Sequence, residues 1–486
     1  MITRRQALKG LAAGFGLSAL RAESPSRTAR VLLFLDEQSV ASFEQVTFHL
    51  NPATKHPENP ILLPGEPHQW DSLQVTWPAT VLHSPRDKMF RCWYSGLDVI
   101  QAPGRAWKPG YAESVDGVHW IKPNLGQIEF LGRPTNQIDG PARVLSSVFE
   151  NPLPGAPESE RFGSLWLDGK GMDSVKVLAY SPDGKIWRRD SVVYGPIKPE
   201  NGKWFQDVSQ FLYEPSEPDP EFRIKCYAQA YFPAGNQSTR RVRQIGLVHG
   251  PDVRHLRDAD EPVVLAPGMG IDEELHFATV SRIGGTYLML FESDRFGANP
   301  IHGDLRVAVS RNGRKFRRVH PKTPLVATGG KGTWEENLLV TTTSALQRVG
   351  DEIHIYYIGC PNVYNSWPVE YAVSPARRGS QFAPTYLGVA ILGRDRFGYA
   401  RGPGVLTTHP WAVEHDEELA LNADGDDVSI RVLSESGETM ARGRLGEHSA
   451  RQLYRKVIWT SRFPKGAARL HITLGPNTKL YSLQVE

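Results

Sequence analysis

Short runs rich in β-branched and aromatic residues make up most of this chain. Runs such as 79–83 and 90–94 have the length of a strand and are bounded by turn residues. The 45 glycines and 37 prolines supply those turns. Long stretches with the 3.6-residue period of a helix are nearly absent. The pattern therefore predicts an all-β protein built from many short strands.

An acidic residue followed by an apolar strand recurs at intervals of roughly 60–70 residues. Each time a second strand rich in aromatic residues comes next, as at 162–166 and 287–291. The five acids are Asp71, Asp139, Asp207, Glu274 and Glu336. Units of this size, each unable to bury its own sheet, predict a five-bladed β-propeller with blades opening near these acids. A stack of β-sandwich domains is the alternative, which the short connecting loops disfavour.

A turn signature keeps the same spacing as the acids. Ser114-Val115-Asp116-Gly117 matches 181–184, and 310–313 carries Asn in place of Asp. Asp-Gly and Asn-Gly supply the positive φ that a tight hairpin needs. We interpret this signature as structural.

The two ends of the chain differ from the repeat. Residues 1–22 resemble a twin-arginine export signal, with Arg4 and Arg5 ahead of an apolar run too short to span a bilayer. This predicts a periplasmic or secreted protein. Residues 386–486 alternate with a period of two and predict a C-terminal β-sandwich, which leaves 23–385 for the propeller. No later segment is a membrane span, and we expect a monomer.

Charge and cysteine content exclude some classes of function. The formal net charge is only +3, without a basic stripe that would follow phosphates, so we expect no nucleic acid partner. Cys92, Cys226 and Cys360 are sparse and odd in number, and they predict buried apolar residues rather than disulfides or a metal site.

Acids that open equivalent strands of a propeller converge on one central funnel. Like charges held together raise the pKa of some of them. Two carboxyl groups in different environments are what cleavage of a glycosidic bond requires, because one donates a proton to the leaving oxygen and the other attacks or activates water. In the alternative interpretation each acid caps a loop or pairs with an arginine such as Arg91, Arg143, Arg282 or Arg295.

Several residues carry a resemblance to a known superfamily. Asn59-Pro60-Ile61-Leu62, Trp70-Asp71-Ser72 and the run 90–96 are similar to the first blade of the five-bladed propeller glycosidases, glycoside hydrolase families 32, 43, 68 and 130. The resemblance spans roughly residues 50–385. It implies Asp71 as nucleophile or base and Asp139 as stabiliser of the transition state.

The general acid of that superfamily is a glutamate of the third blade. This chain has Asp207 there, and the usual Arg-Asp-Pro and Glu-Cys signatures of family 32 are missing. The alternatives for the acid are Glu273, Glu274, Glu292 and Glu336.

Sugar-stacking rings and polar side chains accompany these acids. The expected substrate-binding residues are Trp70, Arg91, Tyr94, Arg143, His276 and Tyr371. We expect no cofactor and no metal ligand set. Some family 43 members hold a structural Ca²⁺ in the funnel through His and water, and His276 is the residue here that would correspond.

Three functions are compatible with these features. The first is an exported glycoside hydrolase that acts on a poly- or oligosaccharide. The second is a non-catalytic carbohydrate-binding propeller. The third is a glycoside phosphorylase, which requires a basic phosphate pocket and is disfavoured by export.

Overall fold

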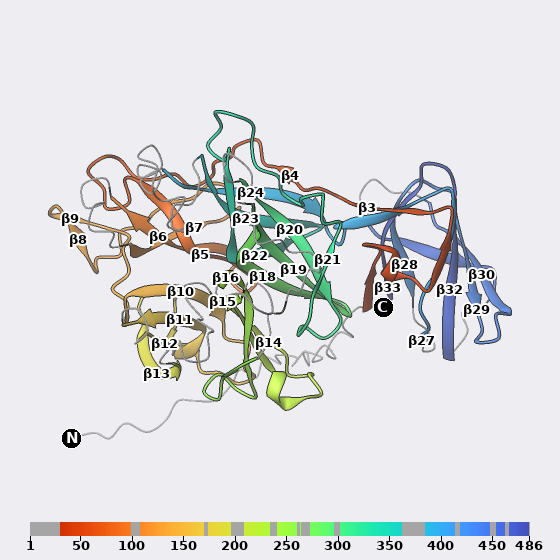
Figure 1. Ribbon diagram of the computed structural model, residues 1–486, viewed down its shortest axis with the longest axis horizontal. Coiled ribbons are helices and arrows are strands. Elements are labelled where there is room, and N and C mark those ends of the chain that lie inside the picture. Colours follow the sequence, from red (N-terminus) through yellow and green to blue (C-terminus); the bar gives the residue numbers. More distant parts are fainter. Residues whose placement is uncertain are drawn as a thin grey trace, which may run out of the picture.

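The computed structural model describes residues 30–98, 107–169, 174–195, 209–233, 241–259, 263, 273–295, 302–361, 384–413, 418–447, 453–461 and 466–485. The predicted all-β class is confirmed, since these ranges contain strands and no α-helix. Short 3-10 helices occur at η1 (Glu37–Ser39), η3 (Glu158–Glu160) and η6 (Pro220–Phe222). Figure 1 shows a larger unit and a smaller one beside it, joined by the segments that carry β3 and β4. The expected export signal lies outside the described residues.

Three sheets are simple meanders of consecutive antiparallel strands. They comprise β5 (Gln74–Ser84), β6 (Met89–Leu97) and β7 (Lys108–Ser114); then β10 (Val144–Glu150), β11 (Phe162–Asp168), β12 (Val175–Ser181) and β13 (Arg188–Tyr194); then β14 (Ser209–Tyr213), β15 (Ile224–Pro233), β16 (Arg241–Gly250) and β17 (Arg257–Asp258). A hairpin of β8 (Glu129–Phe130) and β9 (Arg133–Pro134) follows the first.

The fourth sheet has eight strands and consists of two further meanders. The strands are β18 (Glu273–Ile283), β19 (Thr286–Arg295), β20 (His302–Ser310) and β21 (Arg317–Val319), then β22 (Leu338–Val349), β23 (Glu352–Cys360), β24 (Tyr386–Gly393) and β4 (Thr54–Lys55). One parallel pair, Gly303 with Leu338, joins the two meanders. Strand β4 comes from the start of the chain and pairs with β24, so the last meander is completed by an N-terminal strand.

The first strands of the meanders meet at the centre of the larger unit. They contact one another in the closed order β5, β10, β14, β18, β22 and back to β5. Apolar clusters fill the space between neighbouring meanders, as in the cluster that holds Tyr94 of β6 and Ile358 of β23.

The repeated turn signature is a hydrogen-bonded loop, as predicted. In the copy at 181–184 the Ser181 hydroxyl donates to Asp183 (3.0 Å) and accepts from the backbone N–H of Gly184 (2.8 Å). Gly184 has φ 76°, which favours glycine. The copies at 114–117 and 310–313 repeat these bonds.

Each of these turns is held by an aromatic side chain of the neighbouring meander. The glycine carbonyl of the turn accepts a hydrogen bond from a ring N–H or hydroxyl on the second strand of the meander before it in the closed order. The pairs are Trp93 with Gly184 (2.6 Å), Tyr227 with Gly313 (2.8 Å) and Tyr356 with Gly117 (3.0 Å). The last pair joins the last meander to the first, so the turns lock neighbouring sheets together.

The smaller unit is one sheet of twelve strands. The strands are β1 (Arg30–Leu33), β2 (Ser42–Glu44), β3 (Thr47–Leu50), β25 (Gly398–Arg401), β26 (Gly404–Thr407), β27 (Trp411–Val413), β28 (Leu419–Asp424), β29 (Val428–Leu433), β30 (Thr439–Leu445), β31 (Arg455–Trp459), β32 (Gly466–Leu474) and β33 (Lys479–Val485). Strand β31 pairs with both β30 and β28 and so connects the two halves of the sheet.

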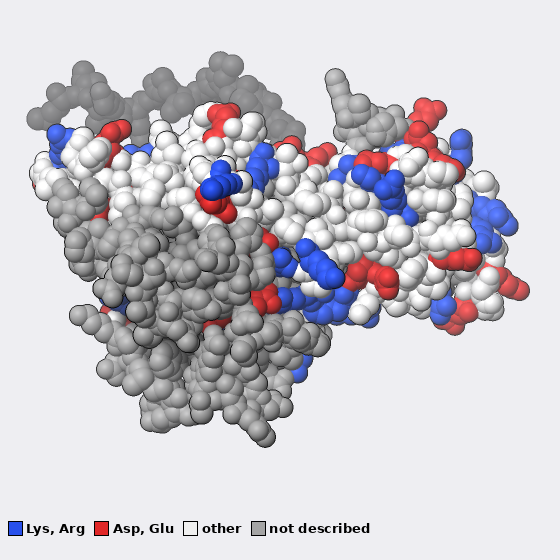
Figure 2. Space-filling model, turned by 45° about the horizontal axis from the view of Figure 1, so that its top comes forward, with Lys and Arg blue, Asp and Glu red and all other residues white. Residues whose placement is uncertain are grey.

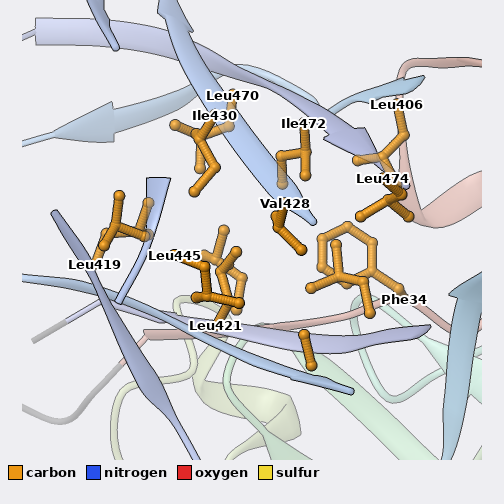
Figure 3. Packing of buried hydrophobic residues seen from close by; sticks show 14 of the residues in the cluster. Phe34, Leu406, Leu419, Leu421, Val428, Ile430, Leu445, Leu470, Ile472 and Leu474 are labelled. Atoms are coloured by element: carbon orange, nitrogen blue, oxygen red, sulfur yellow. The ribbon is translucent and has the colours of Figure 1, made fainter. Parts of the chain in front are cut away.

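A single apolar core lies between these two halves. Ile430 and Ile472 come from one half, and Leu421 comes from the other (Figure 3). Phe34, which directly follows β1, is fully buried in the same core. The start of the chain therefore stabilises a unit that is otherwise built from the C-terminal residues.

The strand pairing differs from the expected division of the chain at two places. Residues 30–50 were expected in the propeller, but β1, β2 and β3 pair with β33, β26 and β25. Residues from 386 onward were expected in the sandwich, but β24 pairs with β23 and β4. The strands β1, β2, β3 and β4 pair with residues more than 300 positions away. The sequence around an outer strand such as β24 does not indicate which strand it pairs with.

Candidate functional site

Asp71, the expected nucleophile or base, lies in a closed hydrogen-bond network. Its Oδ2 accepts from the Tyr94 hydroxyl (2.7 Å) and from Lys122 Nζ (2.5 Å), and its side chain is 2% exposed. The Trp70 ring stacks on Tyr94 and covers the backbone at Gly96 and Gly110, where a Cβ would clash with it. Trp70 and Asp71 therefore hold the loop before β5 against β6 and β7.

The same network occurs a second time, on the last meander. Glu335 accepts from Lys55 Nζ (2.6 Å) and from the Tyr357 hydroxyl (2.8 Å). Trp334 stacks on Tyr357 and covers Gly359 and Gly388. Tryptophan, acid, tyrosine, lysine and two glycines are shared by both copies, so we interpret both as a structural repeat.

The position taken by Asp71 in the first copy therefore belongs to Glu335 in the last, not to Glu336. Glu336 is half-buried and its Oε2 accepts from the backbone N–H of Gly332 (2.6 Å) in the same loop. Glu336, the expected acid, is adjacent to the residue that matches Asp71. Two adjacent glutamates cannot be told apart by spacing. The tryptophan that precedes each acid distinguishes them.

Three further expected residues, Asp139, Arg143 and Arg91, belong to the described part of the chain. Asp139 is exposed, and Arg143 is exposed and donates to the carbonyl of Gly169 (3.2 Å). Arg91 lies opposite Leu82, toward the end of the β5–β6 hairpin away from Asp71, and pairs with Asp87 (2.5 Å). Asp207, Tyr371 and the side chain of His276 lie outside the described residues.

Among the expected acids, Glu274 lies in a buried cluster of charged residues. It is the second residue of β18 and is 3% exposed. Arg243 of β16 donates from Nη1 to Glu274 Oε2 at 3.1 Å. Opposite Glu274 on β19 stands Asp294, with Glu292 two residues earlier on the same face, and both are 0% exposed. We call Arg243, Glu274, Glu292 and Asp294 the acid cluster.

The strand pairing explains how these groups come together. Residues two apart on a strand share a face, so Glu292 and Asp294 project together from the end of β19. Asp294 faces Gly303 on β20, where a Cβ would lie 2.2 Å from Asp294 Oδ1. A larger residue at 303 would displace the carboxylate, so Gly303 makes room for the cluster.

The carboxyl groups of Glu292 and Glu274 lie in different electrostatic environments. Burial raises the pKa of Glu292 well above its usual range, and the charge and hydrogen bond of Asp294 raise it further, while Arg243 acts in the opposite direction. Glu292 therefore holds a proton at a pH where an exposed glutamate has lost it. Glu274 has an ion-pair partner in Arg243, so one glutamate is held as an acid beside another held in an ion pair.

Glu274 and Glu292 were expected from the sequence, whereas Asp294 and Arg243 were not. The signal for Asp294 was available, since Phe291-Glu292-Ser293-Asp294 places two acids at alternate positions after an apolar strand. Arg243 had no local signal. The expected alternative Glu273 faces away from the cluster and accepts from Ser293 and from Arg318 (2.9 Å).

The described ranges show no metal-binding cluster and no membrane-spanning helix. No group of three or more His, Cys, Asp or Glu side chains there has the geometry to hold a metal ion. The side chain of His276, the expected calcium contact, is outside those ranges. No helix in the described part of the chain is long and apolar enough to cross a bilayer.

Comparison with known proteins gives solved structures but no sequence relative. No protein-family model and no curated protein matches the chain. A structure described as a glycoside hydrolase has 14% identity and a TM-score of 0.46 and covers 70% of this chain and 94% of its own. A glycosyl hydrolase from Bacteroides ovatus has 13% identity and a TM-score of 0.43, with coverages of 72% and 95%.

A third similar structure covers more of the chain. It is a glycoside hydrolase family 43 arabinoxylan arabinofuranohydrolase from Bacillus subtilis, with 12% identity, a TM-score of 0.39 and coverages of 89% and 99%.

Proposed function

We propose that this protein is a glycoside hydrolase whose proton donor is Glu292. The observation that carries the proposal is the fully buried Glu292–Asp294 pair beside the Glu274–Arg243 ion pair. Two carboxyl groups whose environments favour opposite protonation states are the arrangement that glycosidic cleavage needs.

Each member of the acid cluster then has one role. Glu292 donates its proton to the glycosidic oxygen as the bond to the leaving sugar breaks. Glu274, ionised beside Arg243, attacks the sugar carbon or removes a proton from the attacking water. Asp294 is a positioning residue that keeps Glu292 protonated between turnovers. Arg243 keeps Glu274 ionised.

The proposed architecture is a five-bladed propeller with a β-sandwich beside it. The closed order of contacts among β5, β10, β14, β18 and β22 supports five blades. The common core of the twelve-stranded sheet supports a sandwich. We place 51–393 in the propeller, and 30–50 with 394–485 in the sandwich, because the strands pair in that way.

Export remains part of the proposal on sequence grounds. Arg4 and Arg5 with the short apolar run after them support a twin-arginine signal over 1–22 and a periplasmic or secreted location. We propose a monomer that acts on a poly- or oligosaccharide.

A second function is favoured by one specific observation. Asp71 is closed off by Lys122 and Tyr94, and Asp139 is exposed, so the two acids that the superfamily resemblance implies do not form a pair. A propeller without that pair is consistent with a carbohydrate-binding protein that does not hydrolyse its ligand.

One experiment separates the two functions. The mature protein is screened against polysaccharides and aryl glycosides beside Glu292→Gln and Glu274→Gln, with binding measured in parallel. A hydrolase releases sugar from at least one substrate and both variants abolish the release. Binding by all three proteins without release supports the non-catalytic function and contradicts the hydrolase.

A further inference from the structure

A groove of about 670 Å³ lies where the two units meet. One side of the groove is formed by residues of β1 and the turn after it, namely Val31, Leu32, Leu33, Leu35, Gln38 and Ser39. The β19 and β20 ends of the fourth meander form another side, and His409 and Pro410 of the smaller unit complete it. Pockets of this size that lie between domains are the usual place for a small ligand.

The floor and the rim of the groove differ in character. Leu33, Leu35 and Phe316 are buried and form an apolar floor. Polar groups stand around it, with Gln38 and His409 among the exposed ones. An apolar floor with a few polar groups that converge on it can hold the ring of a sugar and its hydroxyl groups.

The charged residues that line the groove are all basic. Arg311 and Lys315 are exposed lining residues, and no aspartate or glutamate lines the groove. Arg317 lines the groove as well, and its guanidinium forms an ion pair with Asp36. Figure 2 shows Lys and Arg atoms beside the junction of the two units in that view, with Asp and Glu atoms next to them. The rim therefore favours an anionic ligand.

The charge of residues 1–29 does not favour their binding in this groove. Residues 1–29, which directly precede β1, contain five basic residues and one acidic residue. Like charges disfavour their binding beside Arg311 and Lys315. The occupant is better sought among anions from outside the chain.

We propose that this groove binds a saccharide that carries carboxylate groups, such as a uronate oligosaccharide. The proposal rests on the proposed action on carbohydrates and extends it to acidic substrates. Arg311 and Lys315 contact the carboxylates and the apolar floor contacts the ring. The groove is separate from the acid cluster, because Thr286 at the groove and Glu292 stand six residues apart on β19, about 20 Å.

The test measures binding without turnover. Trigalacturonate is titrated calorimetrically into the full-length mature protein carrying Glu292→Gln, in low salt, beside its fully methyl-esterified form and inorganic sulfate. We expect the acid to bind in the groove at least about tenfold more tightly than the ester and sulfate do, a difference of about 1.4 kcal/mol. Arg311→Gln with Lys315→Gln weakens the acid by a similar factor.

The matched control is Lys331→Gln with Arg444→Gln, two exposed basic residues that do not line the groove. It leaves binding unchanged. The proposal is overturned if the acid and the ester bind with equal affinity, if sulfate binds as tightly as the oligomer, or if the groove variants do not change binding. If the wild type shows turnover but the groove does not bind the acid, only the proposal of a saccharide site in the groove fails. If the groove binds the acid but the wild type shows no turnover, only the proposal of a hydrolase fails.

Discussion

The Tyr94 hydroxyl donates to Asp71 at 2.7 Å, and the same carboxylate oxygen accepts from Lys122 at 2.5 Å. Removing the acid leaves the ammonium group of Lys122 without its counter-ion in a half-buried setting. We therefore expect Asp71→Ala to lower the free energy of unfolding by about 3 kcal/mol, measured by urea denaturation. Glu335→Ala, in the second copy of the network, has a similar effect.

The control for this prediction is the double variant Asp71→Ala with Lys122→Met. Replacing both charged partners removes the unpaired ammonium group, so the loss is smaller than the sum of the single losses. A catalytic Asp71 would give a stable Asp71→Ala protein that has lost all turnover, which is the opposite outcome.

The hydrogen bonds between aromatic residues and turns give a second prediction. Tyr356→Phe leaves the buried carbonyl of Gly117 without its donor and is expected to cost about 1–2 kcal/mol of unfolding free energy. Tyr227→Phe acts alike at Gly313. Tyr180→Phe is the control, since the Tyr180 hydroxyl makes no hydrogen bond in the described structure. Equal losses for all three variants would show that the bonds to the turns contribute nothing specific.

Phe34 links the N-terminal segment to the smaller unit. Its side chain is fully buried in a core made from C-terminal strands, so Phe34→Ala is expected to cost about 3–5 kcal/mol. Phe43→Ala is the matched control, because Phe43 is 40% exposed, and we expect less than about 1 kcal/mol. Thermal unfolding measures both. If Phe34→Ala does not measurably lower the free energy of unfolding, residues 30–35 do not stabilise the smaller unit.

Asp87 gives the fold a predictable dependence on pH. The hydrogen bond from Arg91 lowers the pKa of Asp87 well below its usual range, with Arg161 adding to the effect. Its contribution to stability is therefore complete above about pH 4, the unfolded value, and is lost as the pH falls toward the folded pKa. Because Asp87 is 32% exposed, the contribution is about 1 kcal/mol.

Urea denaturation between neutral pH and pH 2.5 tests this contribution. The decline in stability below pH 4 is shallower in Asp87→Asn than in the wild type, while Glu435→Gln, at an exposed acid, keeps the wild-type slope. Parallel curves for wild type and Asp87→Asn would contradict the assignment.

The sequence predicted those parts of the fold that have a local signal. The Ser-x-Asp-Gly turns and the aromatic second strands are found where expected, because tight turns and buried strands have characteristic residues. The pairing of β1, β2 and β3 with C-terminal strands was missed, because pairing between the two ends of a chain leaves no local pattern.

The site was predicted less well than the fold. The spacing of acids along the chain selected Glu274, which lies in the acid cluster. It selected Asp71 on the same grounds, although Asp71 belongs to a repeated structural network. Spacing shows that acids recur, whereas the ion-pair partner of each acid depends on tertiary packing. Arg243 illustrates this, since it reaches Glu274 from a different meander.

The acid cluster makes a prediction for the pH dependence of activity. Asp294 raises the pKa of Glu292, so Asp294→Asn lowers that pKa. Activity that needs protonated Glu292 is lost as the pH rises through its pKa, so the alkaline limb of kcat/KM moves to lower pH in the variant. Asp304→Asn, at an acid paired with Arg306, leaves the limb in place. An alkaline limb that is unchanged in Asp294→Asn would contradict the coupling.

The central claim is that Glu292 donates the proton to the leaving group, and leaving-group dependence tests it most directly. Glu292→Gln and the wild type are compared on two aryl glycosides of the sugar identified by the screen, one with a poorly acidic phenol and one with dinitrophenol. We predict a loss of about 10²–10⁴-fold in kcat/KM for the poor leaving group and little loss for dinitrophenol, which departs without a proton. Equal losses on both substrates, or no loss on either, would contradict the claim.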